Sequence, residues 1–407
     1  MKQIPGGVTA PKGFRAWGVH CGVKSKKADK KDLTLILSDQ ECAAAAVYTM
    51  NRVKAAPLYV TMEHLEDGTA WGVAANSGNA NACCPMSHEY AEEMARLAAR
   101  ATGRAPADFV VASTGVIGQT LNIAAIRAGM PEAAAGLTAG PEGSDAAARA
   151  IVTTDTVKKE LALACSIGGR TVTLGAIAKG SGMIHPNMGT MLCFVTTDCA
   201  ITQEMLQDAL HAIVPRTFNR VTVDGDTSTN DMCAVLANGM AGNPLIEWKD
   251  DGYTVFLKAL RQLCQELARA IAGDGEGASR LITCAVREAR SEESAERLAK
   301  AVVGSPLVKA AMFGADANWG RVLCAMGYSK APFRPEYVDI SFSSAVGAVA
   351  VCRGGMGLDF DEEAARSILS QDEVVIDVHL HEGEHEATCW GCDLTYDYVK
   401  INGDYRT

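Results

Sequence analysis

Short β-rich runs alternate with amphipathic helical stretches along the whole chain, and this pattern restricts the fold more than any other. Such alternation is typical of α/β proteins with a substantial sheet. The residues predict six strands, at 33–38, 109–113, 171–177, 192–197, 281–287 and 374–380. In the last of them Val374, Ile376 and Val378 alternate with Asp377 and His379, which predicts a strand with one buried face.

Hydrophobic spacing and capping residues mark three helices. Apolar residues between Phe256 and Ile271 recur at intervals of three and four, and Gly273 follows as the expected C′ residue. Thr202 is the expected N-cap of a second helix, and Ser305 with Pro306 opens a third. The segments between these elements are rich in Gly, Asn and Asp, and we expect functional side chains there.

Length and composition indicate a globular protein of two or three domains. The chain has 407 residues, of which 48% are hydrophobic and 21% charged. A formal charge of −10 argues against nucleic acid as a partner, and we interpret the lysine-rich run 24–31 as a solvated loop. No secretory signal and no stretch of about 18 apolar residues is present, so we expect a cytoplasmic protein without a membrane partner. The 14 cysteines are then reduced thiols.

Residues 178–198 carry a pattern that suits self-cleavage. The segment passes from a predicted strand through a glycine-rich turn into an apolar strand that starts after Thr190. Gly189 leaves its own carbonyl unshielded, and the Thr190 hydroxyl can attack it, so that an ester forms and water releases a chain beginning at Thr190. The new α-amino group, with an ordinary pKa of roughly 7.7 to 8.0, can act as base for the same hydroxyl. Spacing alone also fits a threonine that merely starts a strand.

The residues around this segment, KGSGMIHPNMGTML, resemble the cleavage segment of the ornithine acetyltransferase (bifunctional glutamate N-acetyltransferase) family. Nine further segments, among them GGVTAPKGFRAWGV, NSGNANAC, VDGDTSTND and FGADANWGRVL, are similar to that family and follow its order. They lie at 6–19, 51–58, 76–83, 113–118, 153–156, 223–231, 273–278, 313–323 and 390–407. The resemblance implies mixed β-sheets sandwiched between helix layers, a four-layer α/β/β/α-like fold, with a smaller C-terminal α/β region at about 280–407.

The resemblance also implies a set of site residues. Cleavage between Gly189 and Thr190 gives an α chain, 1–189, and a β chain, 190–407, which we expect to pair as an (αβ)2 heterotetramer. Thr190 is then the nucleophile, and Thr114 with Gly115 forms the oxyanion hole. The implied substrate contacts are Thr153, Lys179, Thr190, Glu276, Asn402 and Thr407.

The implied activity is that of a glutamate N-acetyltransferase of arginine biosynthesis. An acetyl group passes from N2-acetyl-L-ornithine to Thr190 and then to L-glutamate, with no cofactor. Some members of the family also accept acetyl-CoA as donor, and nothing in the residues separates the two kinds. Two alternatives are a related self-processing aminopeptidase or amidohydrolase, which hands its acyl group to water, and a non-catalytic protein of this fold. The presence of Thr190, Thr114, Lys179 and Glu276 argues against the second.

Three further motifs are given structural interpretations. Cys389 and Cys392 have the CxxC spacing of redox and zinc sites, yet the family resemblance continues through them, so we interpret them as ordinary thiols and expect no metal site. His185 lies five residues before Thr190 but is not needed as a base. The GDGEGA segment at 273–278 lacks the Lys-Ser/Thr ending of a phosphate-binding loop.

Overall fold

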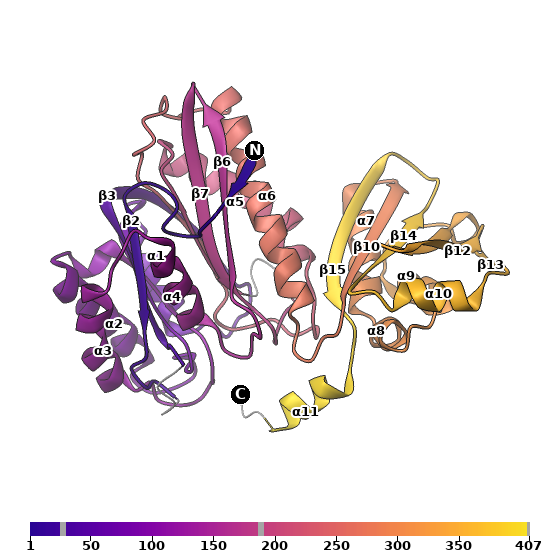
Figure 1. Ribbon diagram of the computed structural model, residues 1–407, viewed down its shortest axis with the longest axis horizontal. Helices are drawn as coiled ribbons and strands as arrows, with labels where there is room; N and C mark the ends of the chain where they lie inside the picture. The colour runs from indigo at the N-terminus through magenta and orange to yellow at the C-terminus, as the bar shows by residue number, and fades with distance from the viewer. Residues whose placement is uncertain (25–29, 186–190, 405–407) are drawn as a thin grey trace.

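The computed structural model describes residues 1–24, 30–185 and 191–404, and within them the chain forms eleven α-helices and two β-sheets (Figure 1). The larger sheet has nine strands in the order β1-β6-β7-β8-β9-β3-β4-β5, with β2 paired to β3. Its strands are β1 (Lys2–Ile4), β2 (Phe14–Val19), β3 (Leu33–Tyr48), β4 (Thr69–Asn76), β5 (Phe109–Ser113), β6 (Lys159–Ile167), β7 (Arg170–Lys179), β8 (Leu192–Thr197) and β9 (Met232–Ala237).

Strand β3 joins the two halves of this sheet. Residues 33–37 of β3 pair with β4, a register shift follows, and residues 43–48 pair with β9. Phe194 on one half of the sheet and Val73 and Val110 on the other belong to the same buried cluster. The two halves therefore face each other across a shared apolar core.

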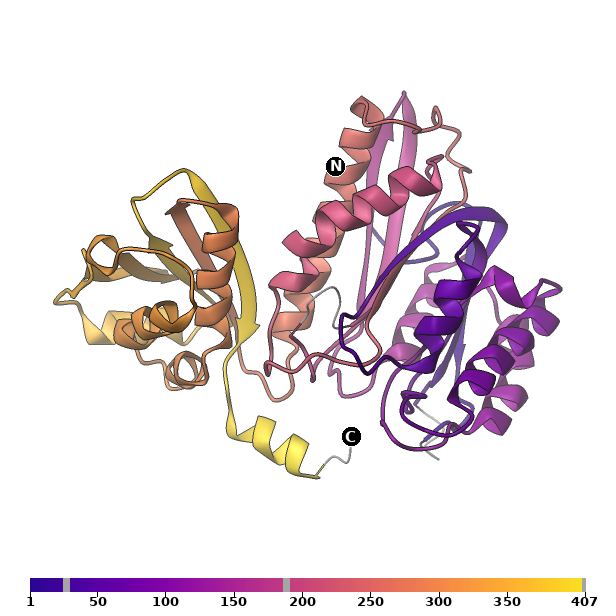
Figure 2. The ribbon, with the colours of Figure 1, turned by 180° about the vertical axis from the view of Figure 1, so that it is seen from behind.

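Helices α2 (Ser87–Thr102), α3 (Ile123–Ala135), α5 (Gln203–Ile213) and α6 (Asp251–Gly273) cover the outer faces of the two halves. Helices α1 (Ala56–His64) and α4 (Pro141–Ile151) contribute Leu58, Ala147, Ala148 and Ile151 to the shared core. Met94 of α2 and Met130 of α3 share a buried cluster with Leu35 and Phe109, and α5 and α6 share another with β6, β7 and β8. The result is a helix–sheet–sheet–helix order, visible in Figures 1 and 2, which confirms the predicted mixed sheets between helix layers.

A second, smaller region follows α6 and has its own sheet and core. Six strands lie in the order β13-β12-β11-β14-β10-β15. They are β10 (Leu281–Ala289), β11 (Asp339–Ser344), β12 (Gly347–Arg353), β13 (Met356–Gly357), β14 (Glu373–His379) and β15 (His385–Cys392), with helices α7 (Glu292–Gly304), α8 (Pro306–Phe313), α9 (Trp319–Tyr328) and α10 (Glu362–Leu369). The predicted C-terminal α/β region is confirmed. Helix α11 (Tyr396–Asp404) leaves it and runs back toward the larger sheet (Figure 2).

The predicted elements agree with the observed ones except in two places. The strands at 109–113 and 192–197 have the predicted bounds, and those at 171–177, 281–287 and 374–380 differ by no more than a few residues. The strand expected at 33–38 is only the first part of β3, because alanine-rich residues 43–46 extend as a strand through pairing with β9. Gly273 is the last helical residue of α6 rather than its C′ residue, and Asp274 ends the helix, donating its N–H to the carbonyl of Ala270.

Among the described residues, no helix combines the length and the apolar character that a membrane span requires.

Candidate active site

A cavity of about 220 Å³ opens beside the end of β7 and brings together six of the residues that the sequence nominates. They are Thr114, Gly115, Thr153, Lys179, Glu276 and Asn402. The segments that supply them are the turn after β5, the α4–β6 loop, the end of β7, the α6–β10 loop and α11. The other nominated residues, Gly189, Thr190 and Thr407, lie outside the described residues.

The turn that holds Thr114 and Gly115 is fixed by close backbone packing. Thr114 N donates to the carbonyl of Asn76 at 3.0 Å. Gly115 has φ +132°, and a Cβ there would lie 2.4 Å from the carbonyl carbon of Gly78 and 2.6 Å from Asn79 N. No side chain fits at this position, so the backbone of the turn reaches the cavity unobstructed.

Asn230 ties this turn to the rest of the site, a role that the sequence does not assign to it individually. Its Nδ2 donates to the carbonyls of Ala80 (2.6 Å) and Ser113 (2.8 Å), and its side chain is buried. Buried amides with two satisfied donors are rigid crosslinks. Asn230 lies in the VDGDTSTND segment, and that motif is the signal that could have identified it.

Lys179 directs a buried charge into the cavity. The residue is 8% exposed, and its Nζ donates to Thr114 Oγ1 at 3.3 Å. In the described part of the chain, none of the salt bridges within 4.0 Å involves Lys179. A buried ammonium without a bonded carboxylate is suited to the carboxylate of a small ligand.

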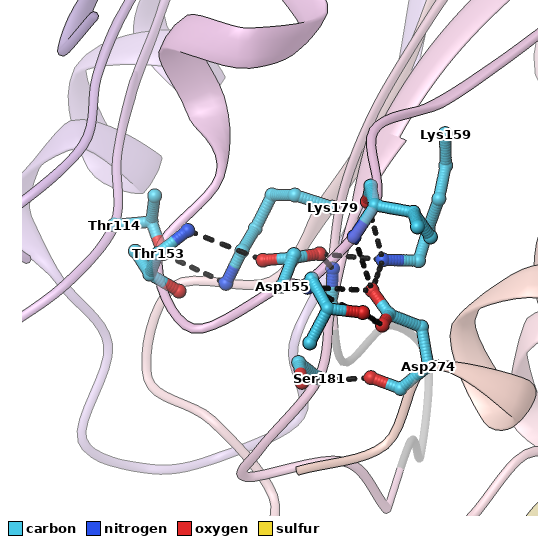
Figure 3. A network of polar contacts seen from close by, with 10 residues as sticks. Thr114, Thr153, Asp155, Lys159, Lys179, Ser181 and Asp274 are labelled. Atoms are coloured by element: carbon cyan, nitrogen blue, oxygen red, sulfur yellow. Dashed lines mark hydrogen bonds and ion pairs between the residues drawn. The ribbon is translucent and has the colours of Figure 1, made fainter. Parts of the chain in front are cut away.

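A buried ion network holds the base of the cavity (Figure 3). Lys159 Nζ lies 2.7 Å from Asp155 Oδ1 and 2.6 Å from Asp274 Oδ2, and all three side chains are almost fully buried. The Asp155 carboxylate also accepts hydrogen bonds from Gly180 N (2.8 Å) and Thr153 N (3.1 Å). The network therefore fixes the backbone on both sides of the cavity floor.

The charges of this network set the ionisation of Asp155. Burial raises the pKa of its carboxyl, but the ammonium groups of Lys179 and Lys159 outweigh that effect and lower the pKa to about 2. Asp155 is therefore a carboxylate at neutral pH, and it is bonded to Lys159. Asp155 and Asp274 lie in segments that the sequence singles out, but their pairing through Lys159 was not predicted.

Glu276 presents a buried carboxylate on the far side of the cavity floor. It is 8% exposed, its N donates to the carbonyl of Ser181 (3.0 Å), and its Oε2 accepts a hydrogen bond from Asn402 Nδ2 (2.7 Å). A Cβ on Gly182 would lie 2.4 Å from this carboxylate, so a side chain at position 182 would displace it. Within the described ranges, no salt bridge joins Glu276 to a cation. A ligand ammonium would complete its partners.

Replacing Glu276 by glutamine should weaken the use of ornithine about tenfold to a hundredfold, the effect of losing one hydrogen bond to a charged group. Glutamine keeps the size of the side chain and an acceptor for Asn402, so the fold should be retained. The measurement is the kcat/KM for ornithine as acetyl acceptor. Unchanged ornithine kinetics would remove Glu276 from the site.

The structure also shows the surroundings of His185 and of the two cysteines with CxxC spacing, Cys389 and Cys392. His185 Nδ1 lies 2.9 Å from Thr222 Oγ1, and burial together with the nearby Lys300 lowers the pKa of His185 to about 4, so the imidazole is neutral. Cys389 and Cys392 lie on opposite faces of β15 and belong to two different core clusters. They cannot form a disulfide with each other or bind one ion together. Burial raises the pKa of both thiols, of Cys389 to about 12.

Across residues 1–24, 30–185 and 191–404, no group of three or more His, Cys, Asp or Glu side chains is arranged to hold a metal ion.

Comparison with known proteins identifies the family. The model of the ArgJ family matches residues 15–407. The arginine biosynthesis bifunctional protein ArgJ of Symbiobacterium thermophilum is 54% identical over 408 residues, which cover 100% of both chains. ArgJ 1 of Clostridium acetobutylicum is 49% identical over 97% of this chain and 96% of its own. The crystal structure of ArgJ from Bacillus halodurans is 47% identical and covers 52% of this chain and 98% of its own, with a TM-score of 0.50. The chain belongs to the ArgJ family of acetyltransferases of arginine biosynthesis, as the resemblance of its motifs predicts.

Proposed function

We propose that the protein transfers an acetyl group from N2-acetyl-L-ornithine to L-glutamate by way of an acetyl ester on Thr190. In the first half-reaction the Thr190 hydroxyl attacks the acetyl carbonyl and ornithine leaves. In the second, the amine of glutamate attacks the ester, and N-acetylglutamate leaves while the hydroxyl is restored. Because both half-reactions use one nucleophile, the kinetics should be ping-pong.

The observation that carries this proposal is the bipolar cavity. Lys179 and Glu276 are buried charges of opposite sign that line the same small space, and the described residues supply neither with an ion-pair partner. An N-acetyl amino acid with a carboxylate at one end and an ammonium at the other matches that arrangement. Thr114 and Gly115 line the same cavity, where a hydroxyl and a backbone N–H would receive the negative charge of the tetrahedral intermediate.

Thr190 requires a free amine to act in this way, so the proposal includes cleavage after Gly189. The fully buried strand β8 begins at Leu192, two residues after Thr190, next to the cavity-lining end of β7. The solved Bacillus halodurans chain matches just over half of this chain while being covered almost completely. That share is close to the share of the segment that follows Gly189, which supports two mature chains.

The remaining assignments belong to the same proposal. The substrate contacts are Thr153, Lys179, Glu276, Asn402 and Thr407, and no cofactor takes part. The curated relatives are named bifunctional, which favours acetyl-CoA as a second acetyl donor. The two chains of a cytoplasmic precursor would assemble as an (αβ)2 heterotetramer.

The test combines intact mass with reaction stoichiometry. Purified, denatured protein should give two chains, the second starting at Thr190, in place of one 42.8 kDa chain. With acetyl-ornithine as donor, each ornithine released should be matched by one N-acetylglutamate formed. Ornithine released without consumption of glutamate would favour the aminopeptidase or amidohydrolase alternative. A single uncleaved chain with full activity would contradict the role of the Thr190 amine.

A further inference from the structure

Polar and charged side chains form two groups in the cavity. Lys179 lies at the end of β7, whereas Glu276, Asp224, Tyr398 and Asn402 meet where α11 reaches the cavity. Asn402 Nδ2 donates to Glu276 Oε2 at 2.7 Å, and the Tyr398 hydroxyl is hydrogen-bonded to the Asp224 carboxylate. We name the second group of four residues the α11 end of the cavity.

If the proposed function is correct, the α11 end of the cavity must accept side chains of opposite charge, those of ornithine and of glutamate. The following inference rests on that function. With the α-carboxylate of either amino acid at Lys179, the rest of its side chain extends toward the α11 end. Ornithine carries an ammonium there, but glutamate carries a carboxylate. Two fixed carboxylates attract the ammonium and repel the carboxylate. A site that serves both amino acids must therefore change its own charge between the two half-reactions.

Asp224 is the carboxylate that is placed to change its charge. It lies between Val221 and β9, where its Oδ2 accepts from Met183 N (2.6 Å) and its Oδ1 from Ile184 N (2.8 Å). Burial raises the pKa of this carboxyl above its ordinary value, although three backbone N–H groups that donate to it, those of Met183, Ile184 and Asp226 (3.3 Å), act in the opposite direction. A ligand carboxylate beside it would raise the pKa further, because like charges disfavour ionisation.

The titratable groups around Asp224 act in both directions, because the hydrogen bond from the Tyr398 hydroxyl favours the carboxylate, whereas the charge of Asp226 favours the neutral acid. Asp226 on the same loop raises the pKa of Asp224. Tyr398 of α11 stays protonated, since burial and the neighbouring carboxylates of Asp224, Glu276 and Asp226 raise its pKa. Cys392 at the end of β15 is also a neutral thiol, because burial raises its pKa.

The geometry points to Asp224 and Tyr398 as the residues that let one cavity accept side chains of opposite charge. As a carboxylate, Asp224 joins Glu276 in binding the ammonium of ornithine. As a neutral acid, it turns its own O–H, together with the Tyr398 hydroxyl and the Asn402 amide, toward the side-chain carboxylate of glutamate. Glutamate binding is thereby coupled to the uptake of a proton from solvent by Asp224.

Proton uptake is measured directly by titration calorimetry of the mature enzyme in buffers of different ionisation enthalpy. At about pH 6, below the ordinary pKa of the Thr190 amine, glutamate should bind with a larger net uptake of protons than ornithine. In Asp224→Asn, this difference between glutamate and ornithine should disappear, because the amide cannot take up a proton. Asp359→Asn, the same change at an exposed position on the C-terminal region, should behave as wild type.

Isotope exchange separates the two amino acids in catalysis. Labelled ornithine exchanges into acetyl-ornithine, and labelled glutamate into acetylglutamate, each through the same acetyl-enzyme. In the wild type the ratio of glutamate to ornithine exchange should rise as the pH falls. Asp224→Asn should lower ornithine exchange about tenfold or more and leave a ratio that no longer varies with pH. Tyr398→Phe, which removes one donor, should lower glutamate exchange more than ornithine exchange.

The outcomes distinguish this inference from the proposed function. Absence of exchange with both amino acids in the wild type would contradict the proposed function itself. Normal exchange in the wild type, but no difference in proton uptake between glutamate and ornithine, would overturn the role of Asp224 alone. Equal losses of both exchanges in Asp224→Asn would do the same, since they would indicate only that the carboxylate supports the backbone at Met183 and Ile184.

Discussion

Replacing Lys159 by methionine should lower the free energy of unfolding by about 3 to 5 kcal/mol, the typical cost of breaking a buried ion pair by removing one partner. Methionine fills a similar volume but removes the ammonium that bonds to both Asp155 and Asp274. Two buried carboxylates that lose their shared cation disfavour each other's ionisation, so the floor of the cavity should rearrange. The measurement is the urea midpoint of the purified protein, together with its acetyl-transfer rate, which should also fall.

Lys158 provides a control at the next position in the chain. Its ammonium pairs with Asp145 at 2.6 Å and with Glu160, but the side chain is 29% exposed. Partly exposed ion pairs typically contribute about 0 to 1 kcal/mol, so Lys158→Met should shift the urea midpoint little. Equal losses for the two variants would show that burial of the network does not contribute to stability as the structure implies.

Replacing Thr114 by valine should lower kcat about 100- to 1,000-fold with little change in KM, because one oxyanion donor typically contributes about 2.7 to 4 kcal/mol to the transition state. Valine has the shape of threonine without the hydroxyl, so the turn should keep its backbone. Thr114 Oγ1 accepts a hydrogen bond from Lys179 Nζ, which leaves the hydroxyl hydrogen free to donate into the cavity. Single-turnover acetylation by acetyl-ornithine measures the affected step.

The matched control is Thr120→Val, at an exposed position a few residues further along the same segment. Its hydroxyl does not line the cavity, so kcat should stay within about twofold of the wild type. If Thr114→Val also lost less than about fivefold, the hydroxyl would be excluded as an oxyanion donor. The backbone N–H of Gly115 would then carry that role.

Local sequence patterns predict those parts of the fold that depend on neighbouring residues alone, such as short buried strands and helix caps. Residues 109–113 and 192–197 are short apolar runs, and they become buried strands with the predicted bounds. Ser305 before Pro306 predicts the start of α8, and the Ser305 side chain accepts a hydrogen bond from Val308 N. Alanines 43–46 have low β-propensity, and their strand exists because β9 pairs with it, which no local pattern reveals.

The residues of the site also fall into those that the sequence predicts and those that only the tertiary fold reveals. Motif resemblance nominates Thr114, Lys179 and Glu276, and the structure places them around one cavity. Lys159 was missed because its partner Asp274 is 115 residues away, so their pairing depends on the tertiary fold. Thr190 lies outside the described residues, and its roles in cleavage and acetyl transfer stay predictions.

The order of strands in the large sheet makes the two pieces of the precursor depend on each other during folding. Strands β8 and β9 follow the proposed cleavage bond, yet they are hydrogen-bonded between β7 and β3, which both precede it. After cleavage, each polypeptide would supply strands that the other needs as neighbours, and each alone would expose unpaired strand edges. If the proposed cleavage takes place, synthesis as one precursor would ensure equal amounts of both pieces and let them interleave before the bond is cut. Coexpression of the two pieces from separate messages should yield aggregates in place of enzyme.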